Sequence, residues 1–198
     1  MQPTEFARLA QDYKQLSDES LIEAIRQTGK TDLFGILYDR YSDKVYRKCL
    51  SFVKDEDIAQ DLVQEILLKV FTQLSKFKGK SRFSTWLYSI TYNYCVEYYR
   101  KQTKYATKDI EEGPDISDVT DDEETLLRLR VDQLKKALDQ IAPEDKVILL
   151  MKYQDDIPIK ELMELFDASE SAVKMRLARA RQRVQAMVKE MDKREENV

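Results

Sequence analysis

Apolar residues recur every three to four positions along most of this 198-residue chain, which is the spacing of one face of an α-helix. The pattern runs from 19 to 100 with short breaks, and it returns from 126 to about 191. Between the two stretches, 105–125 has no periodicity and contains a Gly-Pro pair, which is typical of a flexible linker. We therefore predict an all-α protein with two small helical domains, 19–104 and 126–192, and a loosely held leader before Asp18.

One helix is predicted over 57–74, and its two faces differ in chemistry. The core-facing positions are Ile58, Ala59, Leu62, Val63, Ile66, Leu67, Val70 and Phe71. The opposite stripe consists of Asp57, Gln60, Asp61, Gln64 and Glu65, with Leu68 among them. An acidic stripe is ordinarily a solvated face, but an apolar residue surrounded by charge is typical of an interface. The stripe is therefore a candidate surface for a protein partner.

The C-terminal pattern predicts three helices in close succession. Pro143 opens one that runs through Tyr153, and Pro158 opens a second that runs through Phe166. After a turn at Asp167, Ser169 is a suitable N-cap for a third helix that extends to about Met191. The predicted buried stripe of this third helix is Val173, Leu177, Ala180, Val184 and Met187. The residues predicted to face outward are Ser171, Met175, Ala178, Arg179 and Gln182, and Lys174 and Arg176 flank them.

A short helix, a tight turn and a second helix with a basic outer face form the helix-turn-helix arrangement. In that arrangement the second helix places its N-terminal residues against base edges in the major groove of DNA. The alternative is an ordinary helical hairpin with a solubilising outer face.

The segment 77–105 holds nine of the nineteen aromatic residues of the chain. From Lys76 to Tyr105 it has a single acid, Glu97, and seven bases: Lys76, Lys78, Lys80, Arg82, Arg100, Lys101 and Lys104. Cations neutralise phosphates, and exposed aromatic faces stack on unpaired bases by about 1–3 kcal/mol each. The segment therefore suggests a surface for single-stranded nucleic acid, although a tyrosine-rich core with lysines at its rim would have the same composition.

Within this segment, the residues 76–82 connect two helical patterns and include Gly79, one of only four glycines. We interpret them as a basic loop between the rings of Phe77 and Phe83, suited to wrapping an extruded base. Trp86 follows in the next helix and is expected to be partly buried.

Composition narrows the possible functions further. Only four glycines and four prolines favour helices, and the absence of histidine removes the usual general base and metal ligand. Two cysteines cannot form a structural zinc site, and no glycine-rich phosphate loop is present. We therefore expect no catalytic residue, no metal and no cofactor. Cys49 and Cys95 lie in apolar helical patterns and are expected to be buried thiols in a reducing cytoplasm.

The net charge of −4 conceals a strong segregation of charge. The predicted linker, 105–125, has nine acids and one base, whereas 170–189 has six bases and one acid. No apolar run approaches the ~20 residues of a membrane span, and the N-terminus has no signal-peptide pattern. We expect no membrane insertion.

Three motifs in this order resemble those of bacterial RNA polymerase sigma factors. The sequence from Asp57 to Glu65 resembles their polymerase-binding helix, and 83–90 followed by Asn93 resembles their promoter-melting segment. The sequence 173–181 resembles their recognition helix for the upstream promoter element. The order, the spacing and the acidic linker are similar to the compact extracytoplasmic-function (ECF) subfamily, which keeps only the second and fourth sigma regions.

This resemblance implies a role for each surface. Core polymerase would be bound by Asp57, Asp61, Gln64, Glu65 and Leu68. The minus-ten promoter element would be melted and held as a single strand by Lys76, Phe77, Lys78, Lys80, Arg82, Phe83, Trp86, Asn93 and Arg100. The minus-thirty-five element would be read as duplex DNA by Ser171, Lys174, Met175, Arg176, Ala178, Arg179 and Arg183. An anti-sigma factor is a further expected partner.

Two other classes of function fit parts of the sequence. A helix-turn-helix regulator with an N-terminal sensor domain would explain the C-terminal helices, but it has no need of a basic and aromatic segment. An enzyme acting on nucleic acid could hold Mg²⁺ with carboxylates alone, but the acids gather in the patternless linker. Co-purification with core polymerase and a nuclease assay with Mg²⁺ would distinguish these alternatives.

Overall fold

The computed structural model describes residues 13–105 and 131–196 of the chain. Those residues form helices and no strand, and the chain divides into two compact units, Met1–Glu97 and Tyr98–Val198. The predicted all-α architecture is therefore confirmed. The predicted acidic linker, 105–125, lies outside the described residues except for Tyr105.

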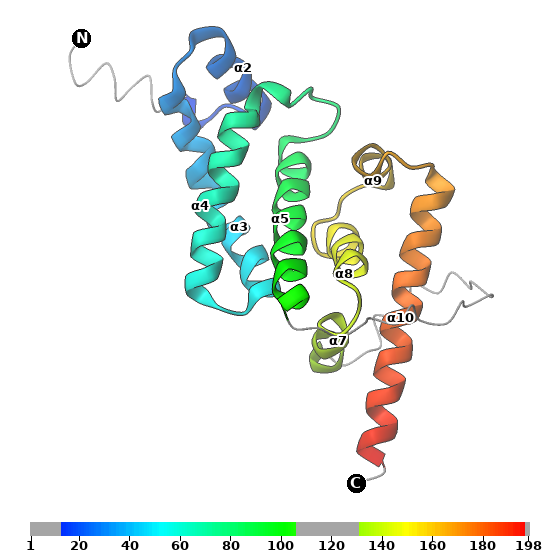
Figure 1. Cartoon of the computed structure of the whole chain (residues 1–198). Coiled ribbons are helices and arrows are strands. Elements are labelled where there is room, and N and C mark those ends of the chain that lie inside the picture. Colours follow the sequence, from blue (N-terminus) through cyan, green and yellow to red (C-terminus); the bar gives the residue numbers. More distant parts are fainter. Residues whose placement is uncertain (1–12, 106–130, 197–198) are drawn as a thin grey trace. The chain divides into compact units, whose positions relative to one another are not determined.

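Over residues 13–97, the first unit contains three α-helices, two short 3₁₀ turns and most of a further long helix, coloured blue to green in Figure 1. The elements are α2 (Asp18–Thr28), η1 (Thr31–Leu33), α3 (Phe34–Val53), α4 (Glu56–Gln73), η2 (Leu74–Lys76) and the long α5 (Phe83–Tyr105). The helix predicted over 57–74 matches α4 to within one residue at each end.

The boundaries of α3 and α4 follow from the sequence between them. Lys54 takes a left-handed conformation with φ 57° and donates its backbone N–H to the carbonyl of Leu50, which ends α3. Asp55 then caps α4 by accepting a 3.0 Å hydrogen bond from the backbone N–H of Ile58. The two helices are therefore joined by a tight reversal and pack along each other.

The core of the first unit draws on α2, α3, α4 and α5. Its fully buried side chains include Leu21 and Ile22 of α2, Leu37 and Val45 of α3, Ile66 and Val70 of α4, and Phe83, Leu87 and Tyr92 of α5. Cys49 and Cys95 are also fully buried and are free thiols, with sulfur atoms 3.9 Å apart. The expectation that they are buried thiols is confirmed.

The second unit contains α7 (Val131–Leu138), α8 (Pro143–Leu149), the π-helical turn η3 (Leu150–Gln154), α9 (Ile159–Phe166) and α10 (Glu170–Glu196). Asp167 adopts a left-handed conformation with φ 48° between α9 and α10. The Ser169 hydroxyl then accepts a 3.2 Å hydrogen bond from the backbone N–H of Ala172. The predicted turn and N-cap are therefore confirmed, and α10 runs five residues beyond the predicted end near Met191.

Ion pairs supplement the apolar core of the second unit. Asp145 of α8 is buried and accepts a hydrogen bond from the guanidinium group of Arg183 on α10 at 2.5 Å. Lys146 is also buried, and its ammonium group lies 3.0 Å from the carboxylate of Asp139. Because a buried charge is costly without a partner, these pairs fix α8 against its neighbours.

Candidate functional site

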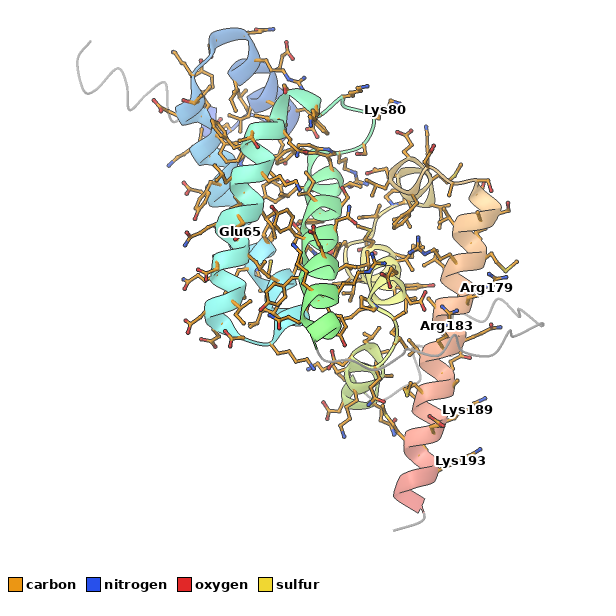
Figure 2. The ribbon with its side chains drawn as sticks, viewed as in Figure 1. Glu65, Lys80, Arg179, Arg183, Lys189 and Lys193 are labelled. Atoms are coloured by element: carbon orange, nitrogen blue, oxygen red, sulfur yellow. The ribbon has the colours of Figure 1, made fainter. Side chains whose placement is uncertain are left out.

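The outer face of α4 carries the predicted polymerase-binding stripe. Asp57, Asp61, Gln64 and Glu65 are all exposed, and Leu68 is 64% exposed among them. Figure 2 labels Glu65 on α4. Every residue of the predicted stripe is therefore accessible to a partner.

An open groove of about 410 Å³ lies beside this stripe, between α4 and the start of α3. It is lined by Thr31, Asp32, Phe34, Gly35, Tyr38, Gln64, Leu67, Leu68 and Phe71. Since Gln64 and Leu68 belong to both the stripe and the groove, the charged face and the apolar depression form one continuous surface. Such an apolar centre with a charged rim has the composition of a protein interface.

The rings of Phe77 and Phe83 lie beneath the basic loop rather than on its surface. Phe77 is 4% exposed and Phe83 is 1% exposed. Their ring centroids are 5.8 Å apart, and both pack against the half-buried Trp86, at 5.4 Å and 5.9 Å. The prediction that these two phenylalanines form an exposed stacking surface is therefore wrong, because their rings complete the core under the loop. The expected partial burial of Trp86 is confirmed.

The loop between these rings presents its cations to solvent. Lys76, Lys78, Lys80 and Arg82 are exposed, and Figure 2 shows Lys80 on the loop between α4 and α5. Gly79 has φ 68°, a conformation that side-chain-bearing residues rarely adopt, so a glycine is suited to this bend. The loop is thus a small positive surface above the buried rings of Phe77 and Phe83.

Three candidate DNA-binding residues share one face of α5, and a fourth lies directly before the helix. Trp86, Asn93 and Arg100 follow one another at intervals of seven residues, and Arg82 lies one turn before Trp86. Asn93 and Arg100 are exposed, and Trp86 is half-buried. The basic loop therefore continues into a mixed aromatic and polar stripe along the helix.

Another part of α5 is held by a buried lysine of α3. The Lys48 ammonium group lies 4.0 Å from the centre of the Tyr88 ring and 3.3 Å from the Tyr92 hydroxyl, and only 6% of the residue is exposed. A cation over an aromatic face is attracted by the ring electrons. Tyr88 and Tyr92 of the 77–105 segment thus pack around Lys48, which favours the alternative interpretation of the composition for these two residues.

Most of the predicted upstream-recognition residues lie on the outer side of α10. Ser171, Lys174, Met175 and Arg179 are exposed, and Arg176 is half-buried with its guanidinium group 4.8 Å above the ring of Phe166. Lys174 forms a 2.7 Å ion pair with Glu170, one turn earlier. The hydrogen bond from Lys174, and then its charge, lower the pKa of the Glu170 carboxyl.

One prediction for α10 is wrong. Ala178 was predicted to face outward, but it is 4% exposed. It lies one turn before Arg181, which is itself buried and donates a 2.6 Å hydrogen bond to the Tyr153 hydroxyl of η3. The buried face of α10 is therefore wider than its apolar stripe. Arg183, predicted as a phosphate contact, is half-exposed, and its guanidinium group forms an ion pair with Asp145.

Helix α2, to which the sequence pattern assigns no role, connects to three other parts of the first unit. Asp18 accepts hydrogen bonds from Arg40, at 2.6 Å, and from the Tyr41 hydroxyl on α3. Burial, and then this carboxylate, raise the pKa of Tyr41. Glu19 and Arg26 contact the two ends of the basic loop. No local sequence signal indicates these last two contacts, because their partners are remote along the chain.

The described part of the chain lacks two kinds of feature. Residues 13–105 and 131–196 contain no group of three or more histidine, cysteine, aspartate or glutamate side chains that could hold a metal ion. Over the same ranges, no helix is both long enough and apolar enough to cross a membrane.

Comparison with protein families identifies both helical units. Residues 37–105 match the family model for sigma-70 region 2, and residues 132–184 match the model for sigma-70 region 4. The N-terminal match accounts for α4, the basic loop and α5 together, and the C-terminal match accounts for the helix-turn-helix.

Curated relatives match over most of their length. The ECF RNA polymerase sigma-E factor of Haemophilus influenzae is 28% identical over 182 residues, which cover 87% of this chain and 95% of that protein. The sigma-E factor of Escherichia coli K12 is 27% identical, with 91% and 99% covered. The ECF sigma factor SigX of Bacillus subtilis is 29% identical, with 72% and 77% covered.

Solved structures share the fold. The sigma factor RpoE of Bartonella quintana, in complex with the anti-sigma factor NepR, has a TM-score of 0.55 at 22% identity and covers 79% of this chain and 96% of its own. CnrH, in complex with the cytosolic domain of CnrY, has a TM-score of 0.60 at 20% identity, with 87% and 97% covered. Both sigma regions are matched in order, and relatives matched over nearly their whole length are ECF sigma factors. The chain therefore belongs to the ECF subfamily of the sigma-70 family and directs RNA polymerase to promoters.

Proposed function

We propose that this sigma factor divides its work among three surfaces. The α4 stripe of Asp57, Asp61, Gln64, Glu65 and Leu68 docks on core RNA polymerase. The basic loop and the outer face of α5 open the minus-ten element and hold its non-template strand. The N-terminal half of α10 reads the minus-thirty-five element as duplex DNA. The domains that carry these roles are 19–104 and 126–192, with 105–125 as the linker.

The observation that carries this proposal is the division of charge among exposed residues. Those on α4 are acidic around the exposed Leu68, whereas those on the loop between α4 and α5 and on the outer side of α10 are basic. A basic surface suits phosphates, and an acidic one repels them but suits a basic protein partner. One chain can therefore bind DNA and polymerase through separate faces despite a net charge of −4.

The capture of an unpaired base is assigned to the loop cations and to Trp86, Asn93 and Arg100. The burial of Phe77 and Phe83 leaves these rings as the floor of the loop. Trp86, half-buried on the same cluster, offers an aromatic surface on which a base can stack. No step of this process needs a covalent reaction, and we infer that the protein has no catalytic activity of its own.

An anti-sigma factor is a further proposed partner, supported by the complex in which the RpoE structure was solved. The free, buried thiols of Cys49 and Cys95 are consistent with action in the reducing cytoplasm. Run-off transcription with core polymerase on a promoter library tests the whole assignment. Promoter-specific transcripts that depend on this chain would support it, and their absence despite stable binding to core polymerase would contradict it.

A further inference from the structure

Helix α2 ends before residue 37, where the match to sigma region 2 begins, so the family comparison gives it no role. Figure 1 shows α2 at the same end of the first unit as the loop between α4 and α5. Its side chains contact the chain on both sides of 78–82. The geometry of these contacts carries the inference.

Arg26 of α2 holds the entry to the loop. One nitrogen of its guanidinium group, Nη2, donates to the carbonyl of Leu74 at 2.9 Å and to the carbonyl of Phe77. These two carbonyls lie at either end of the short turn η2, where α4 gives way to the loop. Because the donor is charged, these hydrogen bonds are stronger than those between neutral groups. They fix the backbone immediately before the loop.

Glu19 of α2 holds the exit from the loop. Its carboxylate accepts a 3.1 Å hydrogen bond from the backbone N–H of Phe83, the first residue of α5. The first N–H groups of a helix have no partner within the helix, and a negative charge near them complements the helix dipole. Glu19 therefore serves as a cap supplied from a distant part of the chain. Only residues 78–82 remain between the two fixed points.

The helix that supplies both contacts is itself firmly held. Leu21 and Ile22 of α2 are 0% and 1% exposed in the core of the unit. Asp18 joins the start of α2 to Arg40 and Tyr41 of α3. Movement of the loop ends relative to α3 is therefore opposed by a braced element rather than by a single mobile side chain.

We propose that Glu19 and Arg26 are positioning residues for promoter opening. They hold both ends of the loop so that Lys78, Lys80 and Arg82 already have their DNA-binding arrangement before a base is extruded. A loop ordered in advance loses less conformational entropy when it binds, so capture of the base is favoured. This inference rests on the proposed role of the loop in holding the unpaired minus-ten strand. Neither Glu19 nor Arg26 needs to contact DNA.

The test uses the full chain in holoenzyme with core polymerase and measures the rate of promoter opening from permanganate reactivity of minus-ten thymines. Arg26→Ala and Glu19→Ala are each expected to slow opening about tenfold, the kinetic equivalent of one hydrogen bond to a charged group. Glu19→Gln keeps an oxygen acceptor and is expected to restore most of the rate. Gln27→Ala is the matched control, since Gln27 neighbours Arg26 but bonds to Glu23 within α2.

A spectroscopic readout reports the loop before DNA is present. Trp86 is the only tryptophan of the chain, and its ring lies 5.4 Å from that of Phe77, whose carbonyl Arg26 holds. Arg26→Ala is expected to increase quenching of Trp86 fluorescence by acrylamide in the free protein, whereas Gln27→Ala leaves it unchanged. Val45→Ala removes buried side-chain atoms on α3 and serves as a control for lowered stability, since Glu19 and Arg26 still hold the ends of the loop in this variant.

The outcomes separate the inference from the function on which it rests. If Lys78→Ala with Lys80→Ala opens promoters at the wild-type rate, the loop has no role in melting and both are overturned. If that variant is slow while Arg26→Ala and Glu19→Ala are not, only the positioning role is overturned. The positioning role is likewise overturned if Val45→Ala, at equal loss of stability, slows opening as much as Arg26→Ala does. The proposal is supported if opening is slow for Arg26→Ala, for Glu19→Ala and for Lys78→Ala with Lys80→Ala, but not for the two control variants.

Discussion

Arg179 and Arg183 lie one turn apart on α10 and differ in what surrounds their guanidinium groups. Arg179 is exposed near the N-terminal half of the helix, whereas Arg183 is paired with the buried carboxylate of Asp145. Figure 2 shows both on α10, followed by Lys189 and Lys193 further along. We therefore propose that the same residue type serves promoter recognition at Arg179, whereas at Arg183 it pairs with a buried carboxylate of the fold.

Arg179→Ala is expected to change which bases are preferred in the minus-thirty-five element. A bidentate contact between arginine and guanine contributes about 1–3 kcal/mol of discrimination against other bases. The measurement is holoenzyme affinity for a set of promoters that differ by single upstream bases. Lys189→Ala, at another exposed cation of α10, should leave the ranking unchanged. An equal loss on every promoter would show that Arg179 contacts only phosphates.

Arg183→Ala is expected to lower the stability of the second unit rather than to change promoter ranking. The substitution would leave the carboxylate of Asp145 buried without this partner. Because Arg183 is half-exposed, we expect the free energy of unfolding to fall by about 1–2 kcal/mol, which is less than for the loss of a fully buried ion pair. Urea unfolding of the free protein measures this change, with Lys189→Ala as the control. Unchanged unfolding would mean that the ion pair contributes nothing to the fold.

At the scale of single elements, α4 presents one face to the core and another to solvent. The periodicity of the sequence predicted which residues lie on each face, because a helix with a wide apolar stripe can be oriented from its sequence alone. Lys54 ends α3 and Asp55 caps the start of α4, so the break between the two helices is fixed by adjacent residues. What the sequence could not reveal is the groove beside Leu68, since much of its lining comes from α3 and η1.

Asp61→Arg with Glu65→Arg is expected to abolish binding to core polymerase while the free protein keeps its stability. Both side chains are exposed, so the change reverses the charge of the stripe without entering the core. Binding is measured by co-purification and by competition with the wild-type chain. Asp39→Arg with Asp43→Arg is the matched control, an exposed pair with the same spacing on α3. Unchanged affinity for the α4 variant would exclude this face as the docking surface.

The loop between α4 and α5 has buried aromatic rings at its ends and exposed lysines, and we propose that only the lysines act on DNA. Phe77→Ala is expected to destabilise the first unit by about 3–5 kcal/mol, since a buried ring is removed from a cluster with Phe83 and Trp86. Lys78→Ala with Lys80→Ala is expected to leave stability unchanged and to slow opening of duplex promoters. A template already melted at the minus-ten element should rescue the lysine variant. If thermal unfolding shows equal losses for both variants, this separation is wrong.

At the scale of the whole molecule, the all-α architecture, its two helical units and the exposure of the α4 stripe could be predicted from periodicity. The direction of individual side chains in the loop could not, because residues outside a helix have no period that points them inward or outward. Phe77 was misplaced for this reason, and Phe83 was misplaced because it is the first residue of α5 rather than part of the loop. Ala178 was misplaced because the buried face of α10 is wider than its apolar stripe, as the burial of Arg181 also shows. The brace formed by Glu19 and Arg26 was missed because its partners are remote in sequence.

The distribution of charge leads to a prediction for the whole chain. With a net charge of −4, the free protein repels DNA at long range, and only local basic surfaces attract it. Core polymerase would supply the remaining neutralisation of phosphates. We therefore expect the free chain to bind a minus-thirty-five duplex weakly at physiological salt, with an affinity that falls as salt is raised, whereas the holoenzyme binds tightly.

Fluorescence anisotropy of a labelled upstream duplex, titrated with the free chain and with the holoenzyme at several salt concentrations, tests this expectation. The slope of the logarithm of affinity against the logarithm of salt concentration counts the phosphates that each species neutralises, at about 0.9 per contact. The free chain should give a slope of small magnitude, because only a few exposed lysines and arginines of α10 can neutralise phosphates. The holoenzyme should give a slope of larger magnitude. Equal slopes and equal affinities would mean that this chain neutralises the promoter alone, and that the acidic residues elsewhere do not limit its access to DNA.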